Sequence, residues 1–188
     1  AIIILGIAVC MLFVASPKYL QFIIMGIGVG LAGTLFILLA SYRAERVMIW
    51  LHPEDYEKGY QTLQGLYAIG SGGLFGRGLG NSVQKLGFLP EAQNDMIFSI
   101  ICEELGIFGG LIVLMLYAYL LYRLFFIAQN APDLFGSLMV SGIFIHIALQ
   151  VILNIAVVVN LMPNTGVTLP FISYGGTSVM FLMLEMGM

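Results

Sequence analysis

Ionisable side chains gather in one polar stretch of this chain, residues 56–106, which lies between strongly apolar segments. A carboxylate in such a stretch can act as a general base, and a lysine or arginine can contact phosphate oxygens. The groups of interest are Arg77, Lys85, Glu91, Asp95, Glu103 and Glu104. We expect any chemistry of the chain to lie here.

Asp95 stands directly before an apolar run that begins at Met96. On position alone it is best explained as a helix cap, which contributes about 1 kcal/mol, and the helix dipole favours its ionised form. Glu91, one turn earlier, is then either a solvated acid or an assistant to Asp95. Glu103 and Glu104 lie two turns into the predicted helix, where a charge must face a polar interior or a partner. We expect these two to hold the helix bundle together.

A glycine cluster at residues 70–80 precedes these carboxylates. It matches neither G-x-G-x-x-G nor G-x-x-x-x-G-K-[ST], and no buried strand precedes it, so a nucleotide-binding loop is not indicated. Irregular backbone near a membrane is tolerated where it is buried in protein or faces water. We therefore predict a tight irregular loop that lines the mouth of a cavity.

The composition is that of an integral membrane protein surrounded by membrane lipid. Of 188 residues, 60% are hydrophobic and 9% are charged, and the mean hydropathy is +1.01. A soluble domain carries about 25% charged residues, so this chain cannot cover a water-facing surface. A net charge of −3 leaves no basic face for nucleic acid. Cys10 and Cys102 lie in or beside apolar runs, and we expect free thiols rather than a disulfide or a metal pair.

The apolar runs predict an all-α, polytopic bundle of transmembrane helices, because a spanning helix needs about 20 mostly apolar residues. The predicted spans cover residues 2–15, 19–41, 96–122, 135–159 and 172–188. The first and last look truncated, so we expect the chain to be a piece of a longer protein. Glycines in the second span are typical of close helix contact.

The long loop, residues 42–95, carries local helix signals. Proline in a first turn, with carboxylates near the positive end of the helix dipole, makes Pro53-Glu54-Asp55 resemble a helix start. Tyr60, Leu63 and Tyr67 then recur at helical spacing up to Gly70. This predicts a short amphipathic helix along the membrane interface.

Polar groups also mark the fourth span. His146, Gln150 and Asn154 follow one another at i, i+4 positions and therefore share one helix face. These side chains either make hydrogen bonds between helices or line a cavity, and the two interpretations are compatible. An irregular loop at residues 160–168 follows, and counting spans puts it on the same side of the membrane as the long loop. The two loops can therefore meet over one cavity, although loop charges do not decide on which side.

Several stretches, taken in order, resemble the SEDS family of shape, elongation, division and sporulation proteins, and favour its FtsW/SpoVE branch over RodA. They are Gly59-Tyr60-Gln61, residues 73–85, residues 89–98, Glu103-Glu104-Leu105-Gly106, the Gln150 and Asn154 pair, and residues 163–176. The resemblance implies a ten-helix bundle in the bacterial cytoplasmic membrane, with this chain as its C-terminal half and the long loop outside the cell.

The resemblance further implies a peptidoglycan glycosyltransferase that polymerises lipid II in cell division or sporulation. A class B penicillin-binding protein, which crosslinks the strands, and other divisome proteins are the implied partners. Asp95 matches the family's essential aspartate at the end of the large extracellular loop. Gln93-Asn94-Asp95-Met96 departs from the His-Thr-Asp-Phe that relatives often carry, which affects positioning around the aspartate.

Given this resemblance, Asp95 is predicted to be the catalytic base for the acceptor 4-hydroxyl. One base suffices where glycosidases need two carboxylates, because a diphosphate leaves as an anion. A divalent cation, Mg²⁺ or Mn²⁺, with Asp95 as a possible ligand, would stabilise the leaving charge. The predicted substrate-binding residues are Arg77, Asn81, Gln84, Lys85, Glu91, Gln150, Asn154, Thr165 and Ser173.

Two other functions fit the same features. One is a lipid II flippase, with the same cavity and no bond formation. The other is a non-enzymatic scaffold that recruits the crosslinking enzyme. A transporter of a diphosphate is expected to carry basic residues within its helices, and the predicted spans show none at depth.

Overall fold

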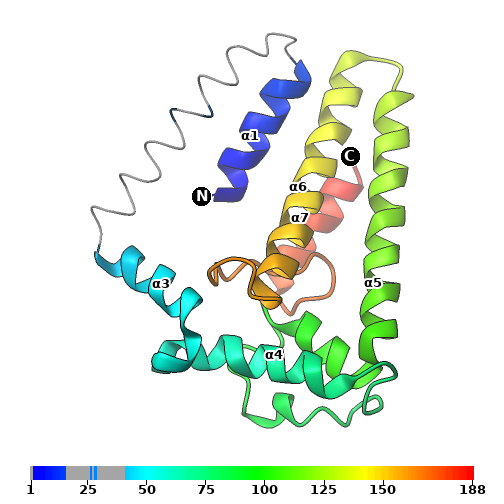
Figure 1. Ribbon diagram of the computed structural model, residues 1–188. Coiled ribbons are helices and arrows are strands. Elements are labelled where there is room, and N and C mark those ends of the chain that lie inside the picture. The colour runs from blue at the N-terminus through cyan, green and yellow to red at the C-terminus, as the bar shows by residue number, and fades with distance from the viewer. Residues whose placement is uncertain (1, 16–25, 27, 29–40) are drawn as a thin grey trace.

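The computed structural model describes residues 2–15, 26, 28 and 41–188, and in these ranges all regular structure is helical. The upright helices in Figure 1 are α1 (Ile2–Ala15), α5 (Ile97–Gln129), α6 (Leu134–Val158) and α7 (Gly176–Met186). The short helix α4 (Tyr60–Gly72) crosses their lower end. The predicted span 19–41 falls almost entirely outside the described residues.

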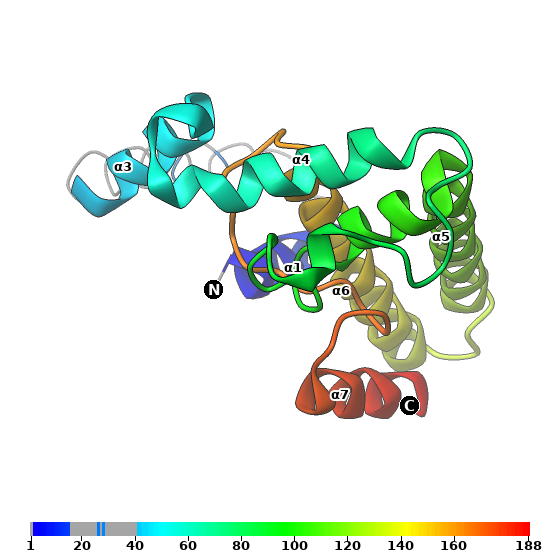
Figure 2. The ribbon, with the colours of Figure 1, turned by 90° about the horizontal axis from the view of Figure 1, so that it is seen from below.

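In the described part of the chain, α5 and α6 are long and apolar enough to cross a membrane, each with a mean hydropathy of 2.1. They pack against each other and are joined by a short turn. Asp133 ends that turn by capping α6, its carboxylate accepting from the Gly136 amide at 3.3 Å. Helix α1 lies along α6, as the views in Figures 1 and 2 agree. The all-helical, membrane-type bundle predicted from the apolar runs is therefore confirmed for these elements.

Helix α5 is broken at Gly106, whose φ of 71° and ψ of −171° are not helical. The break leaves a short part, residues 97–105, and a long part, residues 107–129. At 1.5 Å per residue the long part measures about 35 Å, enough to cross a hydrocarbon core of about 30 Å. Glu103 and Glu104 therefore lie in the short part, before the long part rather than within it.

The glycine loop, residues 73–80, fills this break. The amides of Arg77 and Gly78 donate to the Glu103 and Glu104 carbonyls, both at 2.9 Å. The Ile107 amide donates to the Gly73 carbonyl at 2.9 Å. The loop thus supplies partners for backbone groups that the interrupted helix cannot satisfy itself. The predicted tight loop is present, and it docks on α5.

Gly76 should tolerate alanine much less well than Gly80. Both have positive φ, 77° and 83°, which costs an alanine about 1 kcal/mol. A Cβ at Gly76 would also lie 2.2 Å from the Glu104 carbonyl oxygen, whereas Gly80 has open space. We expect Gly80→Ala to lower the free energy of unfolding by about 1 kcal/mol and Gly76→Ala by at least about 3 kcal/mol. Thermal unfolding of the purified full-length protein measures both, and equal melting temperatures would contradict the docking.

Helix α4 packs on the short part of α5 through small residues. Gly65, Ala68 and Gly72 are buried, and a Cβ at Gly72 would lie 1.9 Å from the Cys102 carbonyl oxygen. Tyr60 and Tyr67 lie on its exposed face. The predicted short helix is present and begins at Tyr60, and its place along the membrane interface stays a prediction. Pro53–Asp55 forms a separate 3-10 turn, because the backbone is extended at Tyr56.

The segment between α6 and α7 returns to the end of the bundle where α4 lies (Figure 1). Figure 2 views the bundle from this end. Helix α7 begins at Gly176, four residues later than the predicted span 172–188, because residues 171–175 form turns. The long loop and the loop after α6 therefore meet at one end of the bundle, as the span count predicts.

Candidate functional site

A cavity of about 350 Å³ opens where these two loops meet. Its walls come from α3 (Ser41–Leu51), from α4, from the segment before α5 and from the loop after α6. The lining residues are Arg46, Ile49, Trp50, Gln61, Thr62, Glu91, Asp95, Asn160, Asn164, Thr165 and Gly166. Most of these side chains are polar, so the cavity suits a hydrophilic ligand.

Asp95 lies in the wall of this cavity and is 8% exposed. Its backbone carbonyl accepts from Asn154 Nδ2 at 2.7 Å, and the same amide donates to the Val167 carbonyl at 2.8 Å. Asn154 therefore joins α6, the loop after it and the segment before α5. The helix-cap interpretation of Asp95 is wrong, because Met96 occupies the N-cap position and α5 has no side-chain cap.

Gln61 of α4 links the Asp95 carboxylate to the opposite wall. Its Nε2 lies 3.5 Å from Asp95 Oδ1 and donates to the Pro90 carbonyl at 3.3 Å. Its Oε1 accepts from Asn164 Nδ2 at 3.0 Å. The Gln61 side-chain amide thus orients the Asp95 carboxylate through its nitrogen, while Asn164 holds the amide through its oxygen.

Burial raises the pKa of Asp95 above the ordinary value for an aspartate. The nearby Glu91 carboxylate acts in the same direction by like-charge repulsion, while hydrogen bonds from the backbone and from Asn164 oppose it. The expectation that the helix dipole favours the ionised form is therefore outweighed by desolvation. A carboxylate with a raised pKa is a better proton acceptor, and this suits a general base.

Glu91 lines the Asp95 cavity and also a second cavity of about 560 Å³. Its φ of 53° is in the left-handed region, which side chains other than glycine rarely adopt. Its carboxylate accepts a hydrogen bond from the Asn94 side chain. Glu91 and Asp95 therefore line the same cavity, and Glu91 lies at its exposed rim.

The loop after α6 holds the segment before α5 in place. Ser173 Oγ donates to the Asn94 carbonyl at 2.6 Å and accepts from the Leu169 amide at 2.7 Å. The Tyr174 amide donates to the Gln93 carbonyl at 2.8 Å. Ser173, predicted to bind substrate, is buried and uses its hydroxyl inside the protein. Thr165 differs, because its hydroxyl oxygen is buried, lines the cavity and has no hydrogen-bond partner among the described residues.

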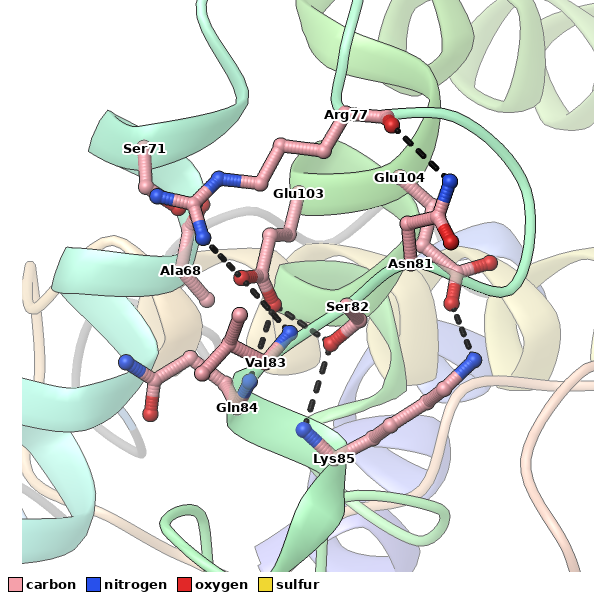
Figure 3. A network of polar contacts seen from close by, with 10 residues as sticks. All are labelled: Ala68, Ser71, Arg77, Asn81, Ser82, Val83, Gln84, Lys85, Glu103 and Glu104. Atoms are coloured by element: carbon pink, nitrogen blue, oxygen red, sulfur yellow. Dashed lines mark hydrogen bonds and ion pairs between the residues drawn. The ribbon is translucent and has the colours of Figure 1, made fainter.

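Four other predicted substrate-binding residues belong to a separate polar network around Glu103 (Figure 3). Glu103 is fully buried and accepts from Ser82 Oγ, from the Val83 amide at 3.1 Å and from the Gln84 amide at 3.3 Å. Arg77 reaches Glu103 at 3.5 Å, and Lys85 pairs with Glu104 at 2.5 Å. The Asn81 side chain donates to the Arg77 carbonyl at 3.3 Å. Glu103 and Glu104 therefore hold the long loop onto α5, not the bundle together.

Arg77, Asn81 and Gln84 do not line the Asp95 cavity, while Lys85 lines the second cavity together with Glu91.

Polar side chains on one face of α6 bind neighbouring elements of the protein. His146 Nδ1 lies 2.9 Å from Glu185 Oε2 of α7, and Asn154 binds backbone carbonyls as described. Gln150 lies between them on that face, and its side-chain oxygen is buried without a partner among the described residues. The interhelical interpretation of this face therefore applies to His146 and Asn154.

Sequence reasoning missed several residues of the site. Trp50 Nε1 donates to the Asn160 carbonyl at 3.0 Å, and Arg46 donates to the Asn164 carbonyl at 3.2 Å. Both come from α3, in which no residue was predicted to bind or to react. Gln61 and Asn164 lie inside stretches that carry the family resemblance, and that signal could have identified them.

A family model described as cell cycle protein and covering FtsW, RodA and SpoVE matches residues 1–188. The chain is 46% identical over 188 residues to stage V sporulation protein E of Bacillus subtilis, covering 98% of this chain and 51% of that protein. It is 42% identical over 192 residues to the probable peptidoglycan glycosyltransferase FtsW of Thiomicrospira cyclica, covering 100% of this chain and 50% of that protein.

A solved structure concerned with the coordination of polymerization and crosslinking by a peptidoglycan synthase complex has the same fold. Its TM-score is 0.74 at 28% sequence identity, over 100% of this chain and 52% of that chain. The chain thus spans about half the length of the curated relatives it matches.

Proposed function

This chain belongs to the FtsW/RodA/SpoVE family of cell cycle proteins, and from that membership we propose that it is part of a peptidoglycan glycosyltransferase that polymerises lipid II. The observation that carries the proposal is the buried Asp95 carboxylate, which has a raised pKa and lies in the wall of a polar cavity at the end of a membrane-type bundle. Relatives named as probable peptidoglycan glycosyltransferases support the same reaction.

In the proposed reaction, the 4-hydroxyl of a lipid II sugar attacks the anomeric carbon of the lipid-linked glycan chain. Its proton passes to the Asp95 carboxylate, and the bond from the anomeric carbon to the diphosphate oxygen breaks. Undecaprenyl diphosphate leaves as an anion, so no acid is needed to protonate it. Gln61 and Asn164 hold the carboxylate in place, which favours catalysis because orientation lowers the barrier.

A divalent cation fits the oxygen atoms of this cavity. Mg²⁺ is commonly held by one or two carboxylates together with substrate phosphates. Asp95 and Glu91 supply two carboxylates here, and the Thr165 hydroxyl oxygen has no hydrogen-bond partner within the part of the chain that the structure describes. The described residues contain no group of three or more His, Cys, Asp and Glu side chains suited to a metal, so phosphate oxygens would complete the set. When bound, Mg²⁺ or Mn²⁺ would neutralise charge on the leaving diphosphate.

The proposed location is the bacterial cytoplasmic membrane, crossed several times, with the long loop and the Asp95 cavity on the outer face. The proposed partner is a class B penicillin-binding protein, which would crosslink the strands, alongside other divisome proteins. The structural likeness to a chain of a peptidoglycan synthase complex supports a partner of this kind.

Purified full-length protein in vesicles with labelled lipid II and Mg²⁺ tests the proposal. We expect glycan strands to form. Movement of lipid II across the bilayer without strand formation would favour the flippase. If the protein neither forms strands nor moves lipid II but still recruits the crosslinking enzyme, the scaffold function would be favoured.

The pH dependence of strand synthesis should report on Asp95 and Glu91. Because the pKa of Asp95 is raised, the rate should fall on acidification at a higher pH than an ordinary aspartate would give. Glu91→Gln removes the like-charge repulsion that helps to raise this pKa, so the acidic limb of the pH–rate profile should move to lower pH. The exposed Glu54 offers a control, since Glu54→Gln should leave the limb in place. An unmoved limb in Glu91→Gln would show that another group controls the rate.

A further inference from the structure

The tip of the glycine loop carries large apolar side chains that the described part of the protein leaves uncovered. Leu74, Phe75 and Leu79 are 58%, 79% and 76% exposed. They lie in a segment, residues 73–80, that is otherwise glycine and arginine, and that is anchored in the break of α5. Such a cluster on a soluble surface would mark an interaction site.

Phe75 contacts the long part of α5 directly. Its ring stacks on the Phe108 ring with centroids 5.3 Å apart. The Ile107 and Phe108 amides also donate to the Gly73 and Leu74 carbonyls, at 2.9 Å and 3.3 Å. The loop tip is therefore held beside the first turn of the part of α5 that is long enough to cross a membrane.

That first turn presents apolar side chains outward. Ile107 and Phe108 are about half exposed, and so are Leu111 and Ile112 one turn further along. Because the long part of α5 only just exceeds the thickness of the hydrocarbon core, its first turn lies at the boundary between lipid tails and headgroups. The apolar surface of the loop tip is thus continuous with the surface of α5 that faces lipid.

We propose that Leu74, Phe75 and Leu79 insert into the membrane leaflet on the side where the long loop lies. Apolar side chains of interfacial segments reach about 5–10 Å into the boundary between headgroups and acyl chains. Arg77, between them in sequence, stays at the polar level, where it pairs with Glu103. The proposal needs α5 to span the membrane and does not depend on the reaction proposed for Asp95.

Insertion would set the height of the site above the membrane. The loop amides bind the Glu103 and Glu104 carbonyls, which belong to the short part of α5. Asp95 lies two residues before that same short part. A loop tip held in the leaflet therefore fixes the Asp95 cavity near the level of lipid headgroups.

Depth-dependent fluorescence quenching tests the insertion. Full-length protein carrying a genetically encoded fluorescent amino acid at position 75 or at position 86 is placed in vesicles whose lipids are brominated high on the acyl chain. Leu86 is a matched control, since it is 77% exposed but lines the second cavity with Ile97 and Ile100 of the short part of α5. We expect quenching at position 75 to exceed that at position 86 by at least about twofold.

Equal quenching at the two positions would overturn the proposal and would leave water or a protein partner as the neighbour of the loop tip. Both labelled side chains are exposed, so folding should survive either change, and matching melting temperatures confirm this. Strand synthesis is not part of the readout. A failure of insertion is therefore distinguishable from a failure of the proposed reaction.

Discussion

Replacement of Asp95 by asparagine should lower strand synthesis by about 10²- to 10⁴-fold, the range that general acid–base catalysis contributes. The amide has nearly the shape of the carboxylate but cannot accept the proton of the acceptor hydroxyl. The backbone carbonyl of residue 95 still accepts from Asn154, and a buried charge is removed. The fold should therefore persist. Initial rates of strand synthesis by the full-length protein measure the effect.

Asp133→Asn provides the matched control. It makes the same chemical change at the cap of α6, at the opposite end of the bundle, where asparagine caps about as well as aspartate. Its rate should equal that of the unaltered protein. Equal rates for both variants would show that no proton transfer depends on the Asp95 carboxylate.

Glu103→Ala should strongly lower the stability of the protein. It removes the acceptor of the Ser82 hydroxyl and of the Val83 and Gln84 amides. The Ser82 hydroxyl is buried and the two amides are part-buried, and a buried donor left without a partner costs about 1–3 kcal/mol. We therefore expect the free energy of unfolding to fall by at least about 3 kcal/mol. Thermal unfolding, with hydrogen exchange at residues 82–84, measures the loss.

Lys85→Ala is the control for this network. It breaks the Lys85–Glu104 pair, whose lysine side chain is one-third exposed, and exposed ion pairs contribute about 0–1 kcal/mol. If Lys85→Ala destabilised the protein as much as Glu103→Ala, surface charge would hold the loop, and the buried carboxylate would not.

The helices of the bundle could be predicted because long apolar runs leave few alternatives in a membrane. The break in α5 could not, because Gly106 lies inside such a run and single glycines are common in spanning helices. Its conformation depends on contact with residues 74–76, about 30 positions earlier in the chain, where a Cβ on Gly106 would meet the Leu74 carbonyl oxygen at 2.3 Å. A contact of this kind leaves no periodic signal.

The candidate site was predictable to the extent that motifs marked it. Asp95, Glu91 and Thr165 were expected together, and all three line one cavity. Arg77 and Lys85 were expected to meet phosphates because they are cations near the site. Charge alone does not reveal which carboxylate each one pairs with, and Glu103 and Glu104 hold them elsewhere. Trp50 and Arg46 act through backbone carbonyls of the loop after α6, for which sequence offers no pattern.

The most direct test of the account separates binding from chemistry in one preparation. Full-length Asp95→Asn protein is titrated with labelled lipid II, and the same sample is then incubated with Mg²⁺ and analysed for linked sugars. We expect lipid II affinity close to that of the unaltered protein, with the rate of strand synthesis lowered by about 10²- to 10⁴-fold. Strand synthesis at the rate of the unaltered protein would contradict the role of Asp95 as the base.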